Sequence, residues 1–191
     1  MHRHIAILLL VFVQGALTAQ PICQIQGTGT ASGFDGQMVT TEGIVTALFT
    51  GTGSLSGYFI EQPDCDSDPA TSNGIFVYDP TPGAVAVGQR LSVTGTVDEF
   101  NGVTELTNAS AVVLGMASSE PTAVALPVPQ GWDWERLEGM YLRFPEQLTV
   151  TDNTGWVQYG ELYLSPGRLV APTNRIDPND AVPSGTNSTG A

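Results

Sequence analysis

Three carboxylates at alternating positions, Asp64, Asp66 and Asp68, form the most suggestive cluster of potential ligands in the chain. Their spacing matches the first ligands of an EF-hand calcium loop. The second half of that loop is missing, because Pro69 stands where its turn glycine belongs and Ile75 where its bidentate glutamate belongs. Two interpretations stay open: a weak Ca²⁺ site, which would be the chain's one cofactor, and a solvated acidic loop.

Histidine and lysine are missing from the chain after its leading segment. Both histidines, His2 and His4, lie among the first 19 residues, and the sequence contains no lysine. The remaining chain therefore lacks the usual general base, the usual neutral metal ligand and the usual amine nucleophile. We assign no catalytic residue, and the pattern excludes a Ser-His-Asp site and a histidine-bound zinc.

A second group of carboxylates, Asp133, Glu135 and Glu138, could suggest the paired acids of a glycoside hydrolase. These residues fall in a segment that predicts a short helix with no cleft, and Arg136 neutralises part of their charge. We do not assign catalysis to them.

Residues 1–19 have the three parts of an export signal. A short polar start precedes an apolar run at 5–13, and small residues end at Ala19. The run is far shorter than the roughly 20 residues that span a bilayer. We therefore expect a secreted protein, extracellular or periplasmic, with no membrane span; an uncleaved anchor or a buried strand is the alternative. In such an oxidising compartment Cys23 and Cys65 are expected to form a disulfide, with free thiols as the alternative.

The chain is strongly acidic, with 19 Asp and Glu residues against six arginines, of which Arg3 leaves with the signal. A surface of this charge repels phosphate backbones at long range. Strong sequence-independent binding of DNA by this chain alone is therefore not expected.

Apolar residues after the leader alternate with a period of two, which predicts strands. Strands are expected around residues 39–47, 57–61, 75–78, 90–100 and 103–114. Asn101-Gly102 is the preferred dipeptide of a type I′ hairpin, which would join the last two strands. We predict an all-β protein whose residues 20–118 form a small, closed or partly closed five-stranded barrel.

The predicted hairpin places Asp98 opposite Glu105, on the face away from the core and beside Phe100. Like charges directly opposite each other are unfavourable. Either water and salt screen this pair, or a cation or a partner's arginine lies against it.

OB folds bind single-stranded nucleic acids by stacking bases on aromatic side chains of strands two and three and by tracking phosphates with basic side chains. Alternation does not show which face of these strands points outward. The candidate nucleic-acid-binding residues are Tyr58, Phe59, Phe76, Tyr78 and Arg90.

The composition changes after the predicted barrel. Prolines and a glycine mark 119–136 as a linker with a short helix. Residues 137–177 regain strand-like alternation, and we expect this β-rich extension to pack on the barrel. The end of the chain, 178–191, has the composition of a flexible tail.

Several separated segments resemble one family, namely 57–63, 68–78, 87–107 and 137–152, together with the opening 24–29. They are similar to the N-terminal OB-fold region, often called YhcR-like, of bacterial extracellular nucleases of the ExeM/NucH type. In that family a downstream endonuclease/exonuclease/phosphatase domain holds the histidines and the divalent metal. None of its motifs is present here, so no catalytic residue is carried over.

The resemblance implies an accessory module that positions nucleic acid or orients a nuclease domain in cis. The implied partners are that domain and single-stranded nucleic acid. The alternative is a structural or protein–protein interaction module without nucleic-acid binding of its own.

Overall fold

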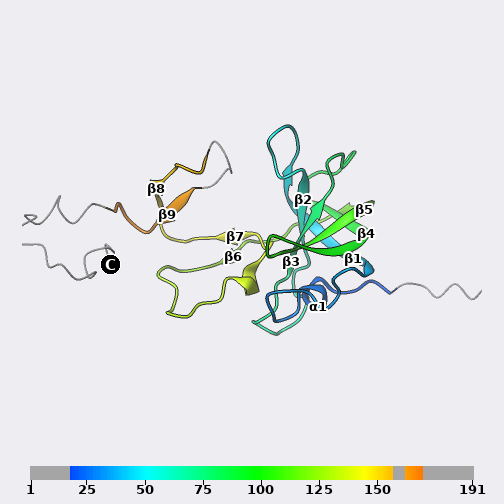
Figure 1. Cartoon of the computed structure of the whole chain (residues 1–191), viewed down its shortest axis with the longest axis horizontal. Helices are drawn as coiled ribbons and strands as arrows, with labels where there is room; N and C mark the ends of the chain where they lie inside the picture. The colour runs from blue at the N-terminus through cyan, green and yellow to red at the C-terminus, as the bar shows by residue number, and fades with distance from the viewer. Residues whose placement is uncertain (1–17, 157–161, 170–191) are drawn as a thin grey trace, which may run out of the picture.

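Five strands close into a barrel in this computed structural model, which describes residues 18–156 and 162–169 (Figure 1). The strand order around the barrel is β1-β2-β3-β5-β4, and β3 and β5 form its one parallel pair. The all-β, OB-like barrel expected from the sequence is confirmed. Its strands are β1 (Met38–Phe49), β2 (Gly57–Glu61), β3 (Gly74–Tyr78), β4 (Gln89–Phe100) and β5 (Val103–Met116).

The barrel core follows from the alternation of the strands. Burial alternates along β1 and β4 with a period of two, which places one apolar face of each strand inside. Gly95 sits at a register shift between β4 and β5. A Cβ there would lie 3.0 Å from the carbonyl oxygen of Thr107, so the close approach of the two strands favours glycine.

A short helix, α1 (Ile22–Gln26), closes one end of the barrel (Figure 1). Ile22 and Ile25 are fully buried in the same apolar cluster as the strands. No helix among the described residues has the length and apolar composition needed to cross a bilayer.

The hairpin between β4 and β5 forms as the sequence predicts. Asn101 and Gly102 have φ angles of 54° and 79°, the positive values that a type I′ turn requires at both central positions. Asp98 pairs with Glu105 across this hairpin. Glu105 is also one of the two β5 residues that pair with β3, where it faces Phe76.

The segment after the barrel is less regular than the sequence suggested. The predicted linker contains a strand, β6 (Thr122–Ala123), which pairs in parallel with β7 (Leu142–Arg143). The predicted short helix is a single 3₁₀ turn, η1 (Glu135–Leu137). Two further strands, β8 (Thr149–Asp152) and β9 (Tyr163–Ser165), form a hairpin beyond β6 and β7 (Figure 1). The expected signal core at 1–17 and the expected tail at 178–191 lie outside the described residues.

Candidate binding groove

A groove of about 710 Å³ lies on the outer surface of the barrel. It follows the junction of β3 and β5, between the loop that joins β1 to β2 and the β4–β5 hairpin. This is the face on which OB folds bind their ligands. The side chains that define its chemistry are Phe59, Phe76, Tyr78, Phe100, Asp98 and Glu105.

Strand alternation places these side chains on one surface. Ile75 and Val77 point into the core, so Phe76 and Tyr78 point outward from β3. Phe59 points outward from the neighbouring strand, and its ring centroid lies 4.9 Å from that of Phe76. A Cβ on Gly57 would lie 2.5 Å from the Phe76 ring, so a glycine at this position gives the ring the space it occupies.

The outer part of the groove is open. Tyr78 is 43% exposed and Phe100 is 60% exposed, which is high for aromatic side chains in a folded domain. Rings held outward in this way supply apolar contact area to a ligand. The groove thus joins a packed aromatic floor, Phe59 and Phe76, to two accessible aromatic walls.

Glu105 lines the groove with a largely buried side chain. Only 7% of the residue is exposed, no described residue donates a hydrogen bond to its carboxylate, and the carboxylate oxygens still reach solvent at the groove surface. Burial, and then the negative charge of Asp98, raise the pKa of Glu105 above its ordinary value. The carboxylate can therefore accept hydrogen bonds from a ligand in the groove.

Tyr58 does not belong to this surface. The residue is 0% exposed, and its ring packs in the core on the face opposite Phe59. Its hydroxyl is buried without a hydrogen-bond partner among the described residues, and burial raises the pKa of Tyr58 to about 12. The predicted base-stacking role of Tyr58 is wrong, because the register of β2 turns it inward.

Arg90 is also absent from the groove. Its guanidinium donates to the carboxylate of Glu42 at 2.6 Å, and it borders a separate hollow near Gln62. Ten residues of strand separate it from Phe100, which is about 33 Å along β4. Among the described residues that line the groove there is no lysine or arginine, and Arg90 is not in place to act as the phosphate contact that the sequence suggested.

Two other carboxylates are covered where the segment after the barrel meets it. Glu138 accepts hydrogen bonds from the backbone N–H of Thr104 at 2.9 Å and from Nε2 of Gln26 at 3.3 Å. Glu61, only 3% exposed, accepts from the hydroxyl of Ser119 at 2.8 Å and from the backbone N–H of Tyr141.

Burial raises the pKa of Glu61 and of Glu138, and these hydrogen bonds oppose the rise. Because Glu138 is committed to hydrogen bonds within the fold, a glycosidase pair with Glu135 and Asp133 gains no support. The sequence did not identify this contact, since Gln26 and Thr104 lie 112 and 34 positions from Glu138.

Close-range contacts accompany these hydrogen bonds. A Cβ on Gly74 would lie 2.3 Å from the carbonyl carbon and oxygen of Gly139, so the two backbones touch. The hydroxyl of Ser72 donates to the carbonyl oxygen of Glu138 at 2.5 Å. Residues 138–142 are thereby attached to the strand ends beside α1.

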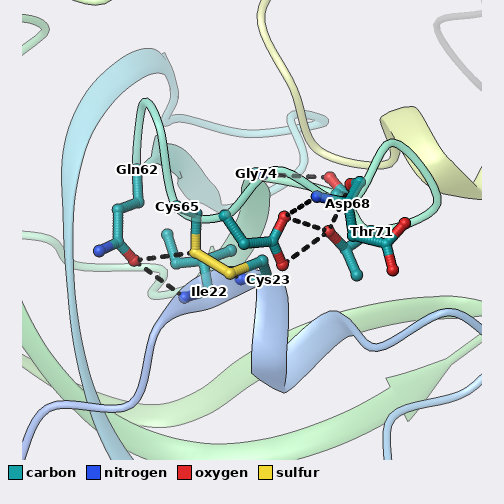
Figure 2. The surroundings of a disulfide bond; sticks show 9 residues. Ile22, Cys23, Gln62, Cys65, Asp68, Thr71 and Gly74 are labelled. Carbon is teal, nitrogen blue, oxygen red and sulfur yellow. Dashed lines mark hydrogen bonds between the residues drawn. A yellow bond between two sulfur atoms is a disulfide. The ribbon is translucent and has the colours of Figure 1, made fainter.

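The disulfide between Cys23 and Cys65 is present, as predicted (Figure 2). Their Cα atoms lie 5.9 Å apart, and the backbone N–H of Ile22 donates to the side-chain oxygen of Gln62 at 3.0 Å beside them. The disulfide fixes α1 to the loop after β2. It fits an oxidising compartment.

The acidic loop next to this disulfide uses its carboxylates internally (Figure 2). Asp66 accepts hydrogen bonds from the hydroxyl of Thr71 at 3.0 and 3.1 Å and from the backbone N–H of Asp68 at 2.9 Å. Asp68 accepts from the N–H of Ala70. Within the described ranges no three acidic, cysteine or histidine residues are arranged to hold a metal, so the geometry lends the calcium prediction at Asp64, Asp66 and Asp68 no support.

Comparison with known proteins adds little to these observations. No family model matches the chain, and no curated protein matches it. Among solved structures, the chain is similar to the hypothetical protein ygiW from E. coli, at 20% identity and a TM-score of 0.29. That match covers 41% of this chain and 77% of the other.

Proposed function

We propose that this chain is a secreted accessory module that docks and orients a protein partner through the groove, and that the partner is the catalytic domain of an extracellular nuclease. The observation that carries the docking part is the composition of the groove. It joins four aromatic side chains to two carboxylates, with no basic side chain among the described residues that line it. The nuclease part rests on the family resemblance of the sequence.

The charge of the groove favours a protein over a nucleic acid. Binding of single strands combines aromatic stacking with a positively charged path for the phosphates. Asp98 and Glu105 instead place negative charge where phosphates would approach, on a chain of formal charge −13. Aromatic side chains are also typical anchors of protein–protein interfaces, where no phosphate has to be accommodated.

Positioning of single-stranded nucleic acid remains the second candidate, because Phe59, Phe76, Tyr78 and Phe100 lie on the ligand face of an OB-like barrel. The two functions differ in their response to groove charge. Neutralising Asp98 and Glu105 would strengthen the binding of a polyanion. A protein partner, in contrast, can bind while both carboxylates keep their charge.

Fluorescence anisotropy with a labelled oligothymidine at low salt tests the choice. We expect no saturable binding by the wild-type chain up to about 100 µM, the weak end of ordinary non-specific affinities. Saturable micromolar binding that tightens in the D98N/E105Q variant would overturn the docking proposal. The nuclease part is tested by the reading frame after Ala191: continuation into a histidine-containing nuclease domain supports it, and a stop codon there refutes a partner in cis.

A further inference from the structure

Glu105 is the group in the groove that calls for a ligand. The residue is more than nine-tenths buried, lines the groove and has no hydrogen-bond partner among the described residues. The buried carboxylate of Glu61 and the half-buried carboxylate of Glu138 show what this fold supplies when a carboxylate is part of its own packing, namely two donors each. No described residue supplies such donors to Glu105, whose oxygens reach the surface of the groove, so a ligand there can donate to them.

A positively charged donor complements the groove best. Asp98 lies directly opposite Glu105 across the hairpin, so two like charges share the groove. None of the described arginines lines the groove: Arg90 pairs with Glu42, Arg136 lies 4.8 Å from the ring centroid of Trp132, and Arg143 and Arg168 are not among the lining residues. A neutral donor would satisfy one oxygen and leave the repulsion in place, whereas a cation removes both costs.

The aromatic walls determine which kind of cation fits. A divalent metal ion prefers six or more oxygen ligands, and the two carboxylates are surrounded by rings. A guanidinium group donates to carboxylates in a fixed fork and also stacks on aromatic faces. The apolar stem of an arginine side chain can lie along Phe76 while its head reaches Glu105.

We infer that the groove binds the side chain of an arginine carried on an apolar segment of a protein partner, with the guanidinium placed between Asp98 and Glu105 and the flanking apolar side chains against Phe100 and Tyr78. This inference rests on the proposed docking function and adds the chemistry of the partner. The volume of about 710 Å³ accommodates an arginine side chain together with neighbouring side chains.

Binding of short peptides to the full chain tests the inference. The probe is an acetylated and amidated pentapeptide with a central arginine between leucines, and its control carries citrulline, which has the same shape without the charge. Two-dimensional NMR of labelled protein reports the position of binding through the amide signals of Phe100, Val103 and Glu105. We expect the arginine peptide to shift these signals saturably and the citrulline peptide to bind at least tenfold more weakly.

Matched variants separate the groove from general acidity. E105Q keeps the shape of the side chain and is expected to lose roughly tenfold or more in affinity for the arginine peptide. E120Q removes the same charge from an exposed position outside the groove and is expected to leave the affinity unchanged. Equal losses in the two variants would overturn the inference.

Three further outcomes would also overturn it. Equal affinities for the arginine and citrulline peptides would show that the positive charge plays no part in binding. No binding at millimolar peptide would show that the groove is not a binding site for such a segment. If free arginine amide binds as tightly as the peptide, the ligand is a small organic cation and not a segment of a protein. The proposed function fails if the chain binds oligothymidine, and this inference fails on the peptide results alone. The two failures are therefore distinguishable.

Discussion

Two regions of the barrel surface bury carboxylates in opposite ways. Where residues 138–142 cover the strand ends, Glu61 and Glu138 each accept two hydrogen bonds from the fold. In the groove, Glu105 is nearly as buried as Glu61 but accepts no hydrogen bond from a described residue, and its oxygens reach the groove surface. The first region therefore uses its carboxylates within the fold, whereas the second leaves one available to a ligand. Burial alone does not separate a structural carboxylate from a binding one; the number of donors around it does.

Loss of the disulfide is the largest expected effect. It should act on the region where residues 138–142 cover the strand ends, the covered region. Cys23 and Cys65 are 42 positions apart, and in the chain-entropy model a loop of that length contributes about 4 kcal/mol to the free energy of unfolding. The C23S/C65S variant should lose this amount in urea unfolding. Reductant should destabilise the wild type by a similar amount and leave the variant unchanged; a loss below about 1 kcal/mol would show that α1 is held by its packing alone.

A methyl group at Gly74 should disturb the covered region without touching the groove. Its Cβ would overlap the backbone of Gly139 and Met140, which cannot move as a side chain does. G74A is expected to destabilise the fold by about 1–3 kcal/mol, the usual cost of overpacking. G33A is the control, because a Cβ there meets nothing within 4 Å. Equal unfolding midpoints for the two variants would mean that residues 138–142 are not closely packed on β3.

Truncation of each carboxylate compares the two regions directly. E138A leaves the N–H of Thr104 without its acceptor and the amide of Gln26 with only its bond to the carbonyl oxygen of Gly74, which should cost about 1–3 kcal/mol. E105A removes a group with no partner and should change the free energy of unfolding by no more than about 0.5 kcal/mol. E138Q, which retains an acceptor oxygen, should recover most of the loss. A larger loss in E105A than in E138A would reverse the comparison.

The smallest expected effect is on the pH dependence of stability. The pKa values of Glu61, Glu105 and Glu138 are raised in the folded chain from the ordinary value of 4.5. Between that value and the raised ones the folded state binds more protons than the unfolded state, so stability rises as the pH falls through this window. Thermal unfolding should show a modestly higher midpoint near pH 5 than near pH 7.

The control for this pH effect is the triple variant E61Q/E105Q/E138Q. It keeps most of the general acidity of the chain, whose repulsion also weakens on acidification. Its midpoint should change less between the two pH values than that of the wild type. An unchanged pH response would assign the effect to overall charge.

The sequence predicted what depends on neighbouring residues. Alternation located the strands, and Asn101-Gly102 predicted the turn that sets Asp98 opposite Glu105. Alternation could not assign the outer face of β2, so Tyr58 and Phe59 had equal claim until closure of the barrel turned Tyr58 inward. The pairing of Arg90 with Glu42, and of Glu138 with Gln26, depends on residues 48 and 112 positions apart, which local pattern does not reveal.

The position of helix α1 at one end of the barrel has a consequence for the order of folding. The β4–β5 hairpin needs only residues adjacent in sequence, so it can form early. Helix α1 is first along the chain, yet its hydrogen bonds reach Gln62, Gly74 and Glu138, at separations of 40, 48 and 112 positions. Such distant contacts carry a high loop-closure cost and slow folding. The apolar interior therefore stays open at one end until most of the chain has folded. Helix α1 is first in the sequence and is the last element to pack.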